Sequence, residues 1–174
     1  TGTNGWGFTS VAGTCSYSQI AGVVPNVGIT RGNVTSAGAT DACTFYLNGG
    51  NPPLGNLGGN TAWEWVFIFR INSTADIRFR IGVASTINVI EPTDGIWLRY
   101  DTNVAYSDTA FHYIARASSA NTEPGGAPTV AVDANFHSFR VRSTSAGTIL
   151  MSVDGAAEQT IASGVPTANM SPIM

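Results

Sequence analysis

Trp63–Arg70 reads Trp-Glu-Trp-Val-Phe-Ile-Phe-Arg, and this stretch decides the fold. Successive side chains of a β-strand point to opposite faces, so the four aromatic rings share one face and Glu64, Val66, Ile68 and Arg70 share the other. Both faces are largely apolar. The pattern therefore predicts a strand in the centre of a sheet.

Five more strand-like runs follow at fairly regular spacing, separated by turns rich in Gly, Pro, Asn and Asp. They are Ile77–Val83, Gly95–Tyr100, Phe111–Arg116, Phe136–Arg142 and Thr148–Val153. Alternation within them predicts inward apolar faces, with Arg78 and Arg80 pointing outward. Asp154–Gly155 is a turn signal. Because no helical period interrupts the runs, the chain is predicted to be all-β, an antiparallel two-sheet β-sandwich.

The 174 residues suit one domain, 1–174, with loop-rich outer strands in 1–60 and the core strands in 61–174. Short apolar pieces in the first part predict these outer strands, at Tyr17–Val24, Gly28–Thr30 and Ala42–Leu47. Gly and Pro make Asn48–Asn60 a loop, and Ser118–Pro128 is predicted to be a flexible, exposed tip between two hairpins. Ser171–Met174 resembles the start of another strand.

Composition excludes several classes of function. Charged residues make up 11% of the chain, the net charge is −3, and all eight basic residues are arginine. This argues against nucleic-acid binding through phosphate neutralisation. No apolar run has the roughly 18 to 20 residues that a membrane-spanning helix needs, so we expect no membrane partner. Cys15 and Cys43 are expected to form either a disulfide or two buried thiols.

Three stretches carry a resemblance to a known family: Trp63–Ile71, Glu91–Asp101 (EPTDGIWLRYD) and Phe136–Pro166 (FHSFRVRSTSAGTILMSVDGAAEQTIASGVP). Over roughly Asn60–Met174 the chain resembles the concanavalin A-like lectin/glucanase superfamily, in the form found in bacteriophage structural, tail-fibre and surface proteins. The resemblance implies a jelly roll. In such relatives another strand usually follows the turn near Pro166, so we expect an incomplete C-terminal strand and a sheet edge that needs a partner strand.

The residues offer little catalytic chemistry. Enzymes of this superfamily that cut β-glucans carry alternating carboxylates on one strand, whereas Glu64 stands alone in its strand. His112 and His137 are expected to serve packing or hydrogen bonding. The loop residues Asp101–Asn103 and Asp108 form a weak calcium candidate whose ligand pattern is incomplete. We therefore expect a protein without catalytic residues, cofactor or metal.

Arginines are the most unusual feature of the strands. If neighbouring strands align them on one sheet face, they form a ladder with Glu64 and Asp101 as partners, which is either a binding face for acidic sugars or an ion-paired outer surface. Among the aromatic residues, the more exposed candidates for sugar stacking are expected to be Trp97 and Tyr106. The arginines of the ladder are Arg70, Arg78, Arg80, Arg99, Arg116, Arg140 and Arg142, and the candidate ligand-binding residues are Trp97, Arg99, Tyr106, Arg78 and Arg80.

The functional expectation is a non-enzymatic structural protein of a virion surface, either a capsid decoration or part of a tail fibre or receptor-binding tip. The phage setting rests on the resemblance alone. Expected partners are other virion proteins or copies of the chain itself in a homo-oligomer, together with a cell-surface glycan. The alternative is a secreted carbohydrate-binding module or adhesin, and a glycan-cleaving enzyme ranks third.

Overall fold

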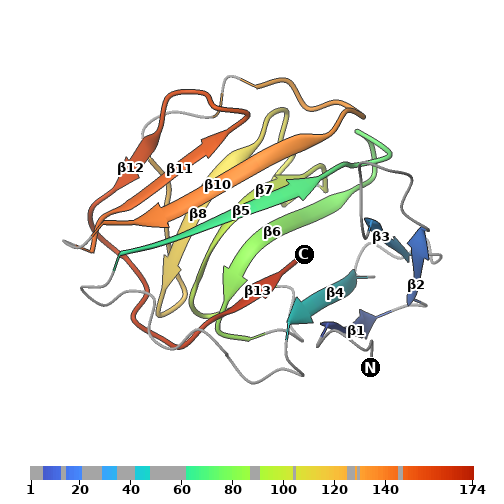
Figure 1. Ribbon diagram of the computed structural model, residues 1–174, viewed down its shortest axis with the longest axis horizontal. Helices are drawn as coiled ribbons and strands as arrows, with labels where there is room; N and C mark the ends of the chain where they lie inside the picture. The colour runs from blue at the N-terminus through green and yellow to red at the C-terminus, as the bar shows by residue number, and fades with distance from the viewer. Residues whose placement is uncertain are drawn as a thin grey trace.

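The structure is a computed structural model of the chain (Figure 1). It describes the backbone of 6–12, 15–20, 29–34 and 42–47, and both backbone and side chains of 62–86, 91–103, 105–124, 128, 130–144 and 147–174. Within these residues there are thirteen strands and no helix: β1 (Trp6–Ala12), β2 (Cys15–Ile20), β3 (Ile29–Val34), β4 (Ala42–Leu47), β5 (Trp63–Phe69), β6 (Arg78–Ala84), β7 (Gly95–Asp101), β8 (His112–Ala117), β9 (Ala120–Thr122), β10 (His137–Ser143), β11 (Ile149–Val153), β12 (Gln159–Ile161) and β13 (Ser171–Ile173).

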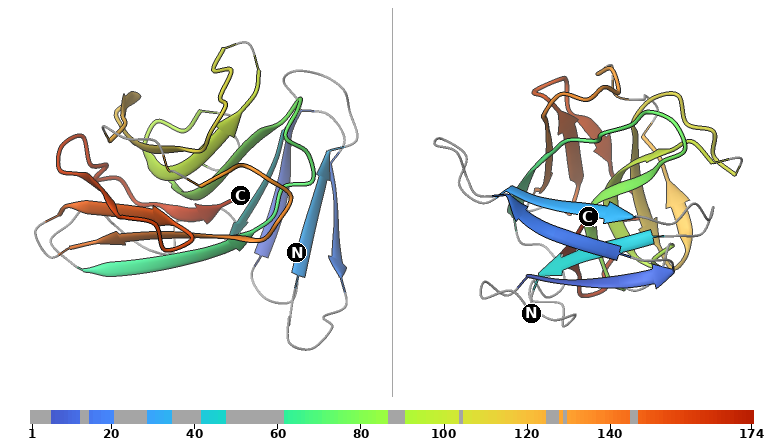
Figure 2. Two further views of the ribbon diagram at one scale, coloured as in Figure 1. Left: turned by 90° about the horizontal axis from the view of Figure 1, so that it is seen from above. Right: turned by 90° about the vertical axis from the view of Figure 1, so that its right-hand side faces the viewer.

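The strands form two packed antiparallel sheets, which confirms the all-β two-sheet sandwich. One sheet has the order β1-β4-β13-β6-β7-β8-β9 and the other has the order β12-β11-β10-β5. Figure 2 shows the two sheets as layers in its left view, with the β2–β3 pair beside one end of them. In the part of the chain that the structure describes, no helix is long and apolar enough to cross a membrane.

The core lies between the sheets and is made by the inward positions of alternating strands. Ile81 of β6, Leu98 of β7, Phe139 of β10 and Met151 of β11 are all at most 2% exposed. Burying a large apolar side chain contributes about 1.5–3 kcal/mol, so these inward positions drive the two sheets together. The outward positions of the same strands are then available for polar side chains.

The six strand-like runs of the second half are all strands, and their bounds agree with the prediction to within a residue at most ends. Ala42–Leu47 is also a strand, with the predicted bounds. The loop predicted at Asn48–Asn60 lies outside the described residues. The side chains of Cys15 and Cys43 are likewise outside the described part, so their pairing stays a prediction.

Two expectations about position were wrong. β5 is the last strand of the four-stranded sheet and not a central one, because β10 is the one described strand that pairs with it. Ser118–Pro128 is not simply a free tip, since Ala120–Thr122 forms β9 and extends the larger sheet beside β8. For β5, the apolar content of the sequence indicated a preference for strand and not the number of neighbouring strands.

The C-terminal segment forms a strand inside the larger sheet. β13 pairs with β6 through Ser171 and Ala84, and with β4 through Ile173 and Tyr46. Met170, just before it, is fully buried. The expectation that a strand starts at Ser171–Met174 is thus confirmed, and β13 lies between β4 and β6 in the larger sheet.

Candidate functional site

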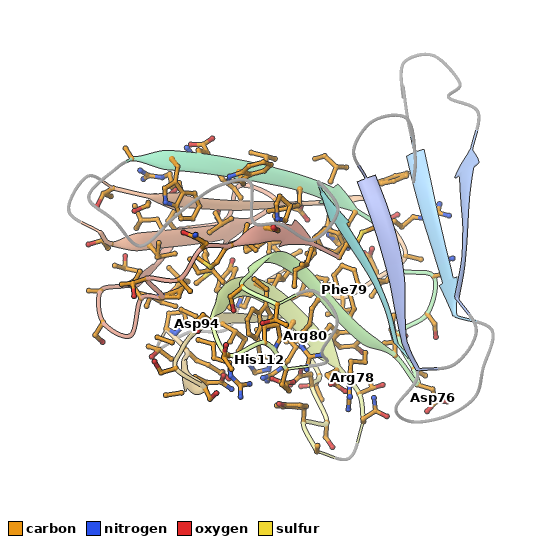
Figure 3. All side chains as sticks on the ribbon, turned by 90° about the horizontal axis from the view of Figure 1, so that it is seen from below. Asp76, Arg78, Phe79, Arg80, Asp94 and His112 are labelled. Atoms are coloured by element: carbon orange, nitrogen blue, oxygen red, sulfur yellow. The ribbon has the colours of Figure 1, made fainter. Side chains whose placement is uncertain are left out.

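A cluster of charged side chains lies on the face of the larger sheet that points away from the core (Figure 3). Alternation places Arg78 and Arg80 of β6 on this face, and the strand register sets Arg80 opposite Arg99 of β7. Arg99 in turn lies opposite His112 of β8. Three adjacent strands therefore bring a row of cationic and imidazole groups together, and we call this side of the sheet the arginine face.

Asp101 neutralises the β6 end of the arginine face. It is 0% exposed, and its Oδ2 accepts a hydrogen bond from Nε of Arg78 at 2.7 Å and lies 3.7 Å from Nη2 of Arg80. Its Oδ1 accepts from the backbone amide and the side-chain amide of Asn103, both at 3.0 Å. All the acceptor capacity of this carboxylate is thus committed inside the protein.

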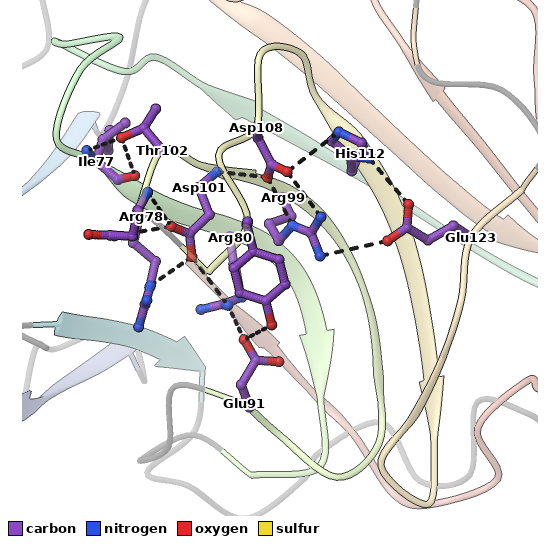
Figure 4. A network of polar contacts seen from close by, with 12 residues as sticks. Ile77, Arg78, Arg80, Glu91, Arg99, Asp101, Thr102, Asp108, His112 and Glu123 are labelled. Atoms are coloured by element: carbon purple, nitrogen blue, oxygen red, sulfur yellow. Dashed lines mark hydrogen bonds and ion pairs between the residues drawn. The ribbon is translucent and has the colours of Figure 1, made fainter. Parts of the chain in front are cut away.

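Asp108 holds the loop after β7 against the same face (Figure 4). It accepts a bidentate pair of hydrogen bonds from Arg99, at 2.9 Å from Nε and 3.1 Å from Nη2. The amide of Asp101 donates to Asp108 at 2.9 Å, and the amide of Asp108 donates to the carbonyl of Asp101 at 2.8 Å. Bidentate pairing fixes direction as well as distance, so the loop folds back over β7.

Glu91 and Tyr106 close the face from two different loops. Glu91 accepts short hydrogen bonds from both Arg80 and Arg116. The hydroxyl of Tyr106 donates to Glu91 at 3.1 Å, and the Tyr106 ring lies 4.1 Å from the guanidinium of Arg99. The ring thereby stacks on one cation while its hydroxyl contacts the counter-ion of two others.

Glu123 and His112 form the more open end of the arginine face. One carboxylate oxygen of Glu123 lies 3.7 Å from Nη1 of Arg99, and the other is 3.2 Å from Nδ1 of His112. Nε2 of His112 is 3.5 Å from Asp108. The side chain of Glu123 is 41% exposed and that of His112 is 30% exposed, so solvent reaches this end.

The pKa values of the side chains on this face depend on two opposing effects, burial of the charged group and its pairing with an opposite charge. Burial lowers the pKa of Arg80, and the charges of Glu91 and Asp101 only partly offset this effect. Burial is the largest single influence on the pKa of Arg99 and acts to lower it, but the hydrogen bonds to Asp108 together with the charges of Asp108 and Glu123 raise that pKa overall. The pKa of Tyr106 is raised by burial and by the neighbouring Glu91 carboxylate.

Trp97 shares this face, but the expectation that it would be exposed was wrong. The indole is 1% exposed, and its Nε1 has no hydrogen-bond partner. A Cβ on Gly95 would come within 2.5 Å of the Trp97 ring, and one on Gly82 would come within 2.6 Å of the Trp97 Cα. Glycines therefore leave room for the indole to lie flat along the sheet, where it is inaccessible to a sugar.

The predicted ligand-binding residues do lie on one face, and Arg78, Arg80, Arg99 and Tyr106 belong to one network. The sequence did not predict that Glu91 and Glu123 belong to this network. Both lie in segments that connect strands, where the alternation of a β-strand cannot predict the direction of a side chain. The ladder of seven arginines is not continuous.

The remaining arginines lie on the other sheet and are paired separately. Arg140 donates to Glu64 at 2.7 Å and to Glu158 at 3.1 Å, and Arg142 makes two bonds to Glu158. Arg70 lies over the Phe136 ring at 5.3 Å. Both predicted carboxylate partners, Glu64 and Asp101, are thus paired with arginines, but in two separate clusters.

His137 serves packing and hydrogen bonding, as expected. It is 4% exposed and packs between Phe69 and Phe111, with ring centroids 5.5 and 5.4 Å away. Its Nδ1 lies 2.7 Å from Asp154, and since a carboxylate only accepts, Nδ1–H is the donor. Asp154 and Gly155 both have positive φ, 51° and 71°, which confirms the predicted turn and aims the carboxylate back at β10.

Metal binding finds no support in the described part of the chain, where no three His, Cys, Asp or Glu side chains are grouped to hold an ion. Asp101 and Asp108, from the weak calcium candidate, are bonded to arginines. Fold and site together define an all-β sandwich with a closed ion-pair network on one sheet. Comparisons with models of protein families, with curated proteins and with solved structures return no match for this chain.

Proposed function

We propose that the chain is a non-enzymatic structural protein of a virion surface with a lectin-like fold, acting as a capsid decoration or as part of a tail fibre or receptor-binding tip. The observation that carries the non-enzymatic part is the pairing of four carboxylates of the arginine face, Glu91, Asp101, Asp108 and Glu123, with arginines. The virion setting is supported by the resemblance of Phe136–Pro166 to the concanavalin A-like sandwiches of phage surface proteins.

The pairing matters because glycoside hydrolysis needs one protonated carboxylic acid and one free carboxylate across the scissile bond. Glu91 and Asp101 each contact two guanidinium groups, so each serves as a counter-ion and not as an acid. The same contacts link β6, β7, β8 and two loops. A network of this kind stiffens a sheet, which suits a protein that bears load on a particle.

Display in many copies supplies the binding strength in this proposal. Copies held at fixed positions on a particle turn each later contact into an intramolecular event, so weak single contacts sum to firm attachment. No deep pocket is required.

Immunogold labelling of intact particles from the source of the chain tests the virion role. An antibody raised against the purified chain is expected to label the capsid or tail, with pre-immune serum as the control. Detection of the chain only in the particle-free fraction would contradict the proposal.

A parallel assay for reducing ends released from a polysaccharide panel is expected to stay at the buffer background, and release above background would overturn the non-enzymatic part.

Binding of a glycan is the second candidate function, favoured by the aromatic ring of Tyr106 on the arginine face, where it stacks on Arg99. The test is a glycan array with the full chain and Tyr106→Ala. Phe136→Ala is the matched control, since Phe136 is a 53% exposed aromatic residue on the other sheet. Saturable binding that is lost only in Tyr106→Ala supports this candidate, and equal signals for both variants contradict it.

A further inference from the structure

The outer side of β5 carries the exposed apolar side chains of the described chain. Val66 is 52% exposed and Ile68 is 64% exposed, and Phe136 beside them is 53% exposed. In the described residues no other large apolar side chain reaches this level of exposure. Such a group on a monomer surface indicates a contact surface.

The same strand also lies at a sheet edge, with no further strand beside it among the described residues. β5 pairs with β10 on one side and is the last strand of the four-stranded sheet; Figure 1 draws it in green next to β10. Its inward residues Trp65 and Phe67 are only partly buried against the core. An edge strand that is apolar on both faces is a template for a further strand.

The sequence of β5 is complementary to itself when read antiparallel. A pairing centred on Phe67 sets Val66 opposite Ile68 of a second copy and Glu64 opposite its Arg70. Shifting the centre by one residue, to Val66 or Ile68, removes the Glu64–Arg70 match and sets Glu64 opposite Ile68 or Asn72. Opposite charges on facing positions stabilise a strand pair, so this register is favoured over its neighbours.

We propose that two copies of the chain associate through β5, in antiparallel register about Phe67, to form one continuous eight-stranded sheet across a twofold axis. Glu64 and Arg70 are both exposed at this edge, where Glu64 also accepts a hydrogen bond from Arg140 and Arg70 lies over the Phe136 ring of its own chain. The inference goes beyond the proposed virion role, because it names the surface and the partner and holds wherever the protein is located.

Sedimentation velocity on charge-reversed full chains tests the register. Glu64→Arg sets arginine against arginine and Arg70→Glu sets glutamate against glutamate, so each variant is expected to raise the dimer dissociation constant about tenfold or more. An equimolar mixture of the two variants restores both charge pairs and is expected to form a heterodimer. The double variant is expected to dimerise like the wild type. Thr160→Arg, at the opposite rim on β12, is the matched control and is expected to change nothing.

Several results would overturn the proposal. They are a wild-type chain that stays at 18.1 kDa up to about 100 µM, a dimer that both reversals leave intact, and a mixture that does not associate. If a reversed chain fails to fold by near-ultraviolet circular dichroism, Ile68→Lys takes its place with the same expected loss. Hydrogen exchange gives a second readout, since β5 amides are expected to gain protection with protein concentration in the wild type but not in Ile68→Lys.

Discussion

At the scale of single residues, the bond between Arg99 and Asp108 is the most consequential polar contact. The two side chains are 7% and 3% exposed, so neutralising Asp108 leaves Arg99 buried with only the longer contact to Glu123, at 3.7 Å, as a carboxylate partner. Asp108→Asn is expected to lower the free energy of unfolding by about 3 kcal/mol, measured by urea denaturation. Glu158→Gln, which breaks the more exposed pair with Arg142, is the control and is expected to cost clearly less. Equal losses would contradict the buried role of Asp108.

Asp154 sets part of the pH dependence of stability. Burial acts to raise its pKa, but the hydrogen bonds from His137 and the Ser138 amide outweigh burial and lower the pKa below its ordinary value of 3.8. A lowered pKa means that the carboxylate contributes stability above the unfolded value and loses it as the pH falls through the folded value. Asp154→Asn is therefore expected to flatten the loss of stability below pH 3.8 and to lower stability at neutral pH. The measurement is the melting temperature as a function of pH. If the melting temperature of Asp154→Asn falls at acidic pH in the same way as that of the wild type, this prediction is wrong.

Some features of the arginine face could be predicted from the sequence and others could not. Strand alternation was enough to predict that Arg78, Arg80 and Trp97 leave the core face. It could not predict that Glu91 would bridge two arginines, because that contact depends on how a connecting loop folds back. It also misjudged the exposure of Trp97, since strand period does not show that Gly82 and Gly95 leave room for the indole to pack along the sheet.

At the scale of elements, the contact of β6 with β7 depends on glycine. Gly95→Ala places a Cβ within 2.5 Å of the Trp97 ring and 2.7 Å of the Val83 carbonyl oxygen. We expect a loss of about 1–3 kcal/mol in the free energy of unfolding, by overpacking. Gly82→Ala is expected to cost more, because its nearest atom is the backbone oxygen of Ile96 at 2.2 Å. Chemical denaturation of both variants checks this order, and the reverse order would contradict it.

The elements themselves were largely predictable, and their places in the sheets were not. Period-two alternation in the sequence identified β6 and β10, and in β10 alternate residues are buried against the opposite sheet. β5 was predicted to be central because both faces are apolar, whereas it lies at an edge with Ile68 exposed. β9 was missed because three residues are too few to show a period. The disagreement over β5 is informative, since an apolar outer face on an edge strand is explained by a partner.

At the scale of the whole molecule, the two sheets differ in what their outer faces offer. The arginine face is occupied by its own loops and counter-ions, with solvent reaching it mainly at Glu123 and His112. The smaller sheet leaves apolar side chains and a strand edge open at β5. We therefore propose that the first surface stiffens the sheet and that the second surface mediates association.

The native mass of the purified wild-type chain, measured by light scattering over a concentration series with negative-stain imaging of the same sample, tests this account most directly. The account predicts a closed oligomer built from dimers, with a mass that rises from 18.1 kDa toward an even multiple of it as concentration increases. A single species of 18.1 kDa at every concentration, with isolated particles in the images, would contradict it.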